Sequence, residues 1–431
     1  MDPVTDPQVR RTRLTSETAA LMNIMKSSIG TGILAMPSAF NNAGLVIGMI
    51  GVPIIGIITI HCMHLLVRCE EELCRRMDQP YLEFERVAES AFRVGPGILR
   101  RHADRAAKSV YVFLCITQIG YCSCYALFAA ESFSEITKDF FHITITTQGF
   151  LIMLLPVMLL ANMIKSLPNL SYFSSVANVL QLGGLCYIFG NLVTDLPPSS
   201  SVRAYADWRT LPLFFGTAIY AFEGIGTVLP IKKGMKQPSA FGGLVGVLNT
   251  AMVVVACLYI GMGFFGFLKY GDQVKGNIAF NLPEGGVNTT VKLVFAIAIF
   301  MSYPLQMYVP VSMIWPKMVH KLDLVHGSEK YDLIDCGFRI LMVTGTFFAA
   351  AVVPRLDLCI SLVGAFCSSC LAWIFPPLFH TLTFWDSRQE TSRLRFLSYV
   401  TKNSLIAVFG MIGFATGTYC SLRDVVSRFS H

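Results

Sequence analysis

The chain has 431 residues, of which 54% are hydrophobic and 14% are charged, with a formal net charge of +7 at pH 7. A soluble protein of this size carries nearer a quarter charged residues, so the composition predicts an all-α integral membrane protein. The basic residues are concentrated in alternate loops, which is typical of membrane topology and not of a nucleic-acid partner.

Eleven apolar segments are long enough to span a lipid bilayer as helices. The predicted spans cover residues 19–43, 45–69, 107–131, 147–164, 171–193, 210–231, 240–269, 290–314, 333–353, 357–380 and 400–421. Lysine and arginine are most frequent in the loops after the second, sixth, eighth and tenth spans. This alternation predicts a cytosolic N-terminus and a C-terminus that is extracellular or lumenal. We expect a cytosolic tail (1–18), one membrane domain (19–421) and a short C-terminal tail (422–431).

Helix-breaking residues interrupt the first span between Ser27 and Pro37. Gly30, Thr31 and Gly32 lie in this stretch, and glycine and proline are poor formers of a continuous helix. A break inside a bilayer leaves N–H and C=O groups without partners, so it persists only beside protein or a polar cavity. The freed N–H groups and the half-helix N-terminus predict a binding site for a carboxylate.

The sixth span repeats this pattern between Phe222 and Pro230, with Gly224 and Gly226 close together. The first and sixth of ten spans are equivalent members of two five-helix repeats, which have opposite orientations because five is odd. The expected units are repeat one (19–193), repeat two (210–380) and one extra helix (400–421). Paired interrupted helices at matching positions indicate a transporter with its site near the midplane of the membrane.

Glu223 is the only acidic residue that the sequence predicts deep inside a span. A buried charge is costly there, so its carboxyl is protonated, paired or facing a polar cavity. One interpretation is a group that reads a substrate amine or carries a proton, with Tyr220 one turn away. The alternative is a neutral carboxyl that hydrogen-bonds the broken backbone and holds the bend.

Several stretches together resemble the proton-coupled amino acid transporter (PAT) family of the amino acid/auxin permease superfamily. The matching stretches are 26–37 with 42–44, 60–69, 222–226 with 228–230, 280–283 and 306–310. The resemblance implies eleven helices with the LeuT-type 5+5 inverted-repeat core, broken at helices 1 and 6. It also implies proton-driven transport of small neutral amino acids, of the alanine, glycine and proline type, at the plasma membrane or at lysosomes and endosomes.

The resemblance also assigns site residues. The implied substrate-binding residues are Ser28, Ile29, Gly30, Thr31, Gly32, Tyr220, Phe222 and Glu223. Glu223 is the proton-coupling residue we expect. We expect no cofactor, and we expect a proton to be transported together with the substrate.

The chain departs from the family pattern at two places. Proton-coupled members carry a histidine three residues before the lysine of the first helix, where this chain has Asn23, which does not titrate. Members also carry a cysteine after the Asn-Leu-Pro of the outer loop, where Glu284 and Gly285 follow Pro283 here. We therefore expect that the family's disulfide is missing and that Glu223 or another group takes the proton.

Catalytic nucleophiles, nucleotide loops and metal clusters are not apparent, so we expect neither an enzyme nor a bound metal. Asn288 begins a glycosylation sequon in an outer loop. A second hypothesis is an amino acid sensor that transports little and signals to a cytosolic partner through the N-terminal tail and the loop after the second span. Such signalling requires a ligand that binds two conformations with different affinity.

Overall fold

The computed structural model describes residues 15–164, 167–243, 245–283, 285–325, 328–353, 355–386 and 393–429. Most of these residues are helical, and the described part of the chain contains no β-strand, only an isolated bridge between Thr15 and Met235. Most of the predicted N-terminal tail and Glu284 lie outside the described residues.

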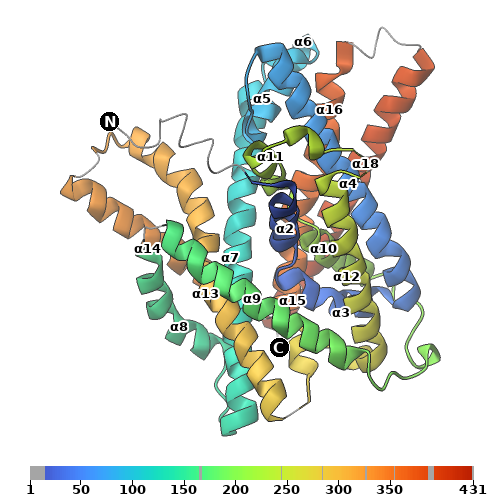
Figure 1. Ribbon diagram of the computed structural model, residues 1–431, viewed down its shortest axis with the longest axis vertical. Coiled ribbons are helices and arrows are strands. Elements are labelled where there is room, and N and C mark those ends of the chain that lie inside the picture. Colours follow the sequence, from blue (N-terminus) through green and yellow to red (C-terminus); the bar gives the residue numbers. More distant parts are fainter. Residues whose placement is uncertain are drawn as a thin grey trace.

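The long helices run side by side or cross one another in a single bundle (Figure 1). In chain order, the α-helices and the π-helix η5 are α2 (Glu17–Ser28), α3 (Thr31–Ala43), α4 (Leu45–Met77), α5 (Phe84–Val94), α6 (Gly97–Arg100), α7 (Ala103–Phe141), α8 (Thr147–Asn162), α9 (Leu167–Leu192), α10 (Leu211–Ala221), α11 (Ile225–Gly234), α12 (Val247–Tyr270), α13 (Gly286–Lys321), α14 (Glu329–Val352), α15 (Leu356–Val363), η5 (Gly364–Ile374), α16 (Phe375–Thr383) and α18 (Arg393–Phe429).

The first predicted span is two half-helices, α2 and α3, whose axes differ by 50°. The α-helical pattern stops at Ser28 and resumes at Thr31, and the N–H of Gly30 turns back to the carbonyl of Ser28 (2.9 Å). The close approach of another helix explains one of the glycines. A Cβ atom on Gly32 would lie 2.7 Å from the Cα of Ala221 in α10. The predicted break in the first helix is confirmed.

The sixth predicted span is also divided, into α10 and α11, with Phe222, Glu223 and Gly224 between them. The two halves together form one apolar segment of 24 residues, long enough to cross a membrane. The second predicted break is therefore confirmed as well. The two breaks lie beside each other, because Gly32 of α3 packs directly against Ala221 of α10.

The number of spans stays a prediction. Eight helices in the described residues are long and apolar enough to cross a membrane, or nine with the bent α2–α3 pair. The apolar α8, with 16 residues, is shorter than that requirement, and α9 has 26 residues. Each of the eleven predicted segments nevertheless overlaps one or more of these helices.

Some predicted boundaries are wrong. The seventh span begins at Val247 and not at residue 240, because Gly243 adopts a positive φ of 93° and Gly246 lies against the carbonyl of Gly242. At the C-terminus, α18 continues to Phe429, so most of the predicted tail is helical.

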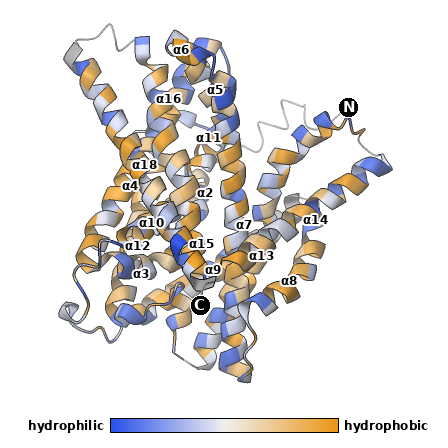
Figure 2. Ribbon diagram, turned by 180° about the vertical axis from the view of Figure 1, so that it is seen from behind, coloured by the Kyte–Doolittle hydropathy of each residue, from blue (hydrophilic) through white to orange (hydrophobic). Residues whose placement is uncertain are grey.

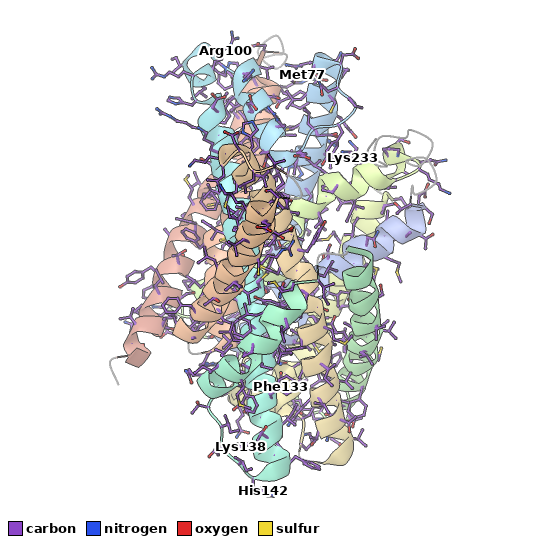
Figure 3. All side chains as sticks on the ribbon, turned by 90° about the vertical axis from the view of Figure 1, so that its left-hand side faces the viewer. Met77, Arg100, Phe133, Lys138, His142 and Lys233 are labelled. Atoms are coloured by element: carbon purple, nitrogen blue, oxygen red, sulfur yellow. The ribbon has the colours of Figure 1, made fainter. Side chains whose placement is uncertain are left out.

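The ends of the bundle agree with the predicted alternation of loops. Met77, Arg100 and Lys233 lie towards one end of the molecule, and Lys138 and His142 lie at the other (Figure 3). Between the ends, apolar residues predominate along the long helices (Figure 2). Large apolar side chains on their outer surfaces are well exposed, as expected of a surface in contact with lipid.

Two local features were not predicted in this form. The loop after the second span carries the helix α5, whose Val87, Ala88 and Ala91 are fully buried. The tenth span contains the π-helix η5, which begins at Gly364. A Cβ atom on Gly364 would overlap the carbonyl oxygen of Gly216 in α10, so η5 packs directly against the first half of the broken sixth span.

Candidate functional site

A cavity of about 970 Å³ reaches both helix breaks. Of the predicted site residues, those that line it are Ser28, Ile29, Gly30, Thr31, Gly32, Tyr220 and Glu223. Phe222 does not line it. Its fully buried ring packs edge-on against Tyr259 with ring centres 5.0 Å apart, so the expected contact between Phe222 and a substrate is not part of this geometry.

Two half-helix N-termini lie at the cavity. Gly30 is the N-cap of α3 and Gly224 is the N-cap of α11, and neither N-cap supplies a side-chain hydrogen bond. The first N–H groups of a helix have no partner inside the helix, and the N-terminus carries a partial positive charge. The arrangement suits a carboxylate, as the sequence predicted, because a carboxylate accepts hydrogen bonds from such groups.

The wall of the cavity between the breaks is polar. The hydroxyl of Thr31, at the start of α3, is 3.0 Å from the hydroxyl of Tyr220 in α10. The ring of Tyr121 from α7 packs edge-on against Tyr220 with centres 5.0 Å apart. On the same wall, the side-chain N–H of Gln306 donates to the side-chain oxygen of Gln118 (2.6 Å), which joins α13 to α7.

Glu223 lies in the sixth-helix break, and only 8% of its surface is exposed. Among the described residues, its Oε2 has no partner in hydrogen-bonding geometry, and neither have the hydroxyls of Tyr121 and Ser368. These three side chains nevertheless interact electrostatically across the space between α7, η5 and the break. Within the described part of the chain, Glu223 forms no salt bridge. Glu223 is therefore a buried carboxyl among neutral hydroxyls. A carboxyl in this environment is either protonated or pairs with a charged group that is bound only part of the time.

Part of this site was not predicted from the sequence. Tyr121 and Ser368 come from α7 and η5, far from Glu223 in sequence. A lone tyrosine or serine in an apolar span carries no signal of its own. Asn23 and Lys26 of α2 also line the cavity, so the asparagine that replaces the family's histidine lies in the same space as the breaks.

The cavity extends from the breaks to the end of the molecule that carries α5. Glu83, Glu85 and Lys317 line that part, and the ammonium of Lys317 is 3.5 Å from the Glu85 carboxylate. At the opposite end, the loop before α10 is bonded to the end of α3. Thr210 donates its hydroxyl hydrogen to the carbonyl of Asn42 (2.7 Å), and Arg203 donates to that of Asn41 (3.0 Å).

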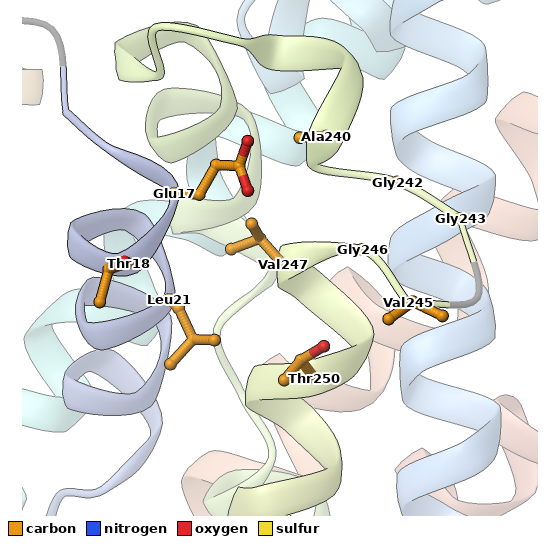
Figure 4. Close-up of a pocket in the computed structure, with 10 residues that line it drawn as sticks. All are labelled: Glu17, Thr18, Leu21, Ala240, Gly242, Gly243, Val245, Gly246, Val247 and Thr250. Carbon is orange, nitrogen blue, oxygen red and sulfur yellow. The ribbon is translucent and has the colours of Figure 1, made fainter.

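Two smaller cavities contain none of the predicted site residues. The first, of about 470 Å³, lies between the start of α2 and the glycine-rich loop before α12 (Figure 4). The second, of about 430 Å³, includes Glu131, which accepts a hydrogen bond from the N–H of Leu356 (2.9 Å).

The glycosylation candidate Asn288 lies in the first turn of α13 and not in a loop. Its side-chain oxygen accepts a hydrogen bond from the hydroxyl of Tyr187 (2.8 Å). Attachment of a sugar to this residue stays a prediction.

The two broken helices and the cavity that they share define a transporter of the LeuT type. A solved structure shares this fold: the chain matches Mhp1, a nucleobase-cation-symport-1 family transporter in a closed conformation with bromovinylhydantoin bound, with a TM-score of 0.53. The match covers 99% of this chain and 96% of that structure. At 14% identity, it is a likeness of fold alone.

The chain belongs to the transmembrane amino acid transporter family, whose family model matches residues 13–423. It is 33% identical over 422 residues to the "Proton-coupled amino acid transporter-like protein pathetic" of Drosophila melanogaster, covering 97% of this chain and 87% of the relative. It is 26% identical over 431 residues to the "Probable amino acid transporter skat-1" of Caenorhabditis elegans, covering 98% and 93%. The predicted resemblance to proton-coupled amino acid transporters is confirmed.

Proposed function

We propose that this protein transports small neutral amino acids, of the alanine, glycine and proline type, together with protons by alternating access. One observation carries the proposal: the uncapped N-termini of α3 and α11 lie at one cavity beside the buried carboxyl of Glu223. The two groups complement the two ends of an amino acid. The family and the first relative's name support both the substrate class and the coupling.

In this mechanism the substrate carboxylate binds the N–H groups at Gly30, Thr31 and Gly32. The substrate amine lies near Glu223, which takes up a proton on one side of the membrane and releases it on the other. Asn23 lines the same cavity but does not titrate. Glu223 therefore carries the proton coupling in which the histidine at this position takes part in other family members. No resident cofactor is needed for these steps.

The direction of opening follows from the predicted topology. If the loop after α4 is cytosolic, the cavity extends to the cytosolic end and the contacts of Asn41 and Asn42 close the outer end. The structure then corresponds to an inward-facing state. Uptake requires the opposite state, in which the Arg203 and Thr210 contacts separate.

The proposal is tested by uptake of radiolabelled alanine, glycine and proline into cells at an outside pH of about 5.5 and about 7.5. We expect faster uptake at the lower pH, accompanied by inward current. Equal uptake at both values would contradict proton coupling. Absence of uptake, in protein shown to reach the membrane, would contradict transport of these substrates and favour the sensor hypothesis.

The pair of hydroxyls between the breaks gives a smaller prediction. Tyr220→Phe leaves the buried hydroxyl of Thr31 without its partner, at a cost of about 1 kcal/mol. We expect the half-saturating concentration of alanine to rise about fivefold, while the ratio of uptake at the two pH values is unchanged. Tyr303→Phe is the matched control, because its buried hydroxyl bonds Thr346 (2.6 Å) away from the cavity. An unchanged concentration dependence in Tyr220→Phe would contradict the prediction.

A further inference from the structure

One buried side chain contacts the backbone at both helix breaks. Tyr259 lies on α12, and none of its surface is exposed. Its hydroxyl donates to the carbonyl of Ser28, the last residue of α2 (2.5 Å), and to that of Ala221, the last residue of α10 (2.7 Å). The ring is fixed by edge-on packing against Phe222.

The two carbonyls belong to the C-terminal ends of their half-helices. The last carbonyls of a helix have no donor inside the helix, and the C-terminus carries a partial negative charge. Two such ends that point to one buried place repel each other unless a donor lies between them. The Tyr259 hydroxyl is the donor between them and shares its single hydrogen between both carbonyls, while the Ser28 carbonyl also accepts from the N–H of Gly30.

Neighbouring contacts hold α12 in register with both breaks. The hydroxyl of Ser28 contacts the sulfur of Met252 (3.9 Å), which lies about two turns before Tyr259 on the same face of α12. On the other side, a Cβ atom on Gly56 of α4 would lie 3.0 Å from the Phe222 ring. The ring of Phe222 is therefore held between α4 and Tyr259, and the phenol has little freedom to leave its position.

We propose that Tyr259 is the positioning residue that joins the two helix breaks, so that α2 and α10 open and close as one unit. The inference does not depend on the substrate or on proton coupling, because it rests on the two carbonyls alone. It assigns Phe222 the role of supporting the Tyr259 ring, in place of the expected contact with substrate.

Hydrogen–deuterium exchange of the purified full-length protein tests this inference. Tyr259→Phe keeps the ring and removes the donor, and we expect exchange to rise about tenfold in peptides covering both 29–32 and 222–225. Tyr303→Phe, which loses a buried hydroxyl bond between α13 and α14, should leave both breaks unchanged. A rise at one break only, at neither, or equally throughout the chain would overturn the proposal.

A second measurement on the unmodified protein covers the case in which Tyr259→Phe does not fold. The peptides at both breaks should lose protection together as urea is raised, because one hydroxyl holds both. Loss of protection at two different urea concentrations would overturn the proposal. Alanine uptake by the same preparation distinguishes failure of the proposed function from failure of the role proposed for Tyr259. Absence of uptake contradicts the proposed function and does not affect the exchange result.

Discussion

Glu223→Gln is expected to abolish the dependence of alanine uptake on outside pH. Glutamine has nearly the shape of a protonated glutamate but does not titrate, so the ratio of uptake at pH 5.5 to uptake at pH 7.5 should fall to about 1. The carboxyl is 8% exposed and makes no salt bridge among the described residues. Neutralising it therefore leaves no buried cation unpaired, and we expect the variant to fold and reach the membrane.

Glu131→Gln is the matched control for this experiment. Glu131 is another glutamate in an apolar span, and it lines the smaller cavity at Leu356. We expect Glu131→Gln to keep the pH ratio of the unmodified protein. A normal pH profile in Glu223→Gln would contradict the assignment. Loss of the pH dependence in Glu131→Gln alone would assign the coupled proton to Glu131.

Gly32→Ala is expected to inactivate the protein. The added Cβ atom would lie 2.7 Å from the Cα and 2.9 Å from the Cβ of Ala221, closer than real Cβ contacts allow. Because the obstacle is largely backbone, α3 and α10 must separate, which costs about 1–3 kcal/mol. The same shift moves the N–H groups that we assign to the substrate carboxylate. We expect alanine uptake to fall about tenfold or more, measured against the amount of protein at the membrane.

Gly190→Ala in α9 provides the control for that variant. A Cβ atom at Gly190 meets nothing within 4 Å, and alanine favours the helix over glycine. We expect unchanged uptake and equal or higher thermal stability. If Gly32→Ala transports as well as Gly190→Ala, the close approach of the two broken helices is not required for function.

The helix breaks were predictable because local composition encodes them. Glycine and proline cluster at 27–37 and 222–230, and a break inside a membrane is tolerated only at a polar site. The pairing of first and sixth spans followed from counting apolar segments. Glu223 stood out in the sequence as well, since an isolated carboxyl in an apolar span is exceptional, and the structure buries it in the break between α10 and α11.

The contacts between distant spans were not predictable in this way. Tyr259, Tyr121 and Ser368 reach the breaks only because α12, α7 and η5 pack against them. In a membrane span, a tyrosine or serine is common and its direction depends on helix rotation, which periodicity alone does not fix. The same uncertainty applies to Phe222, whose ring packs against Tyr259 and does not line the cavity.

Coupled movement of an amino acid and a proton by this chain can be measured directly. The most direct test places the purified protein in liposomes that contain a pH-sensitive dye, with no initial pH gradient, and adds alanine outside. Proton-coupled transport predicts acidification of the lumen that depends on alanine and is absent in Glu223→Gln. Accumulation of alanine without any change of lumenal pH would contradict it.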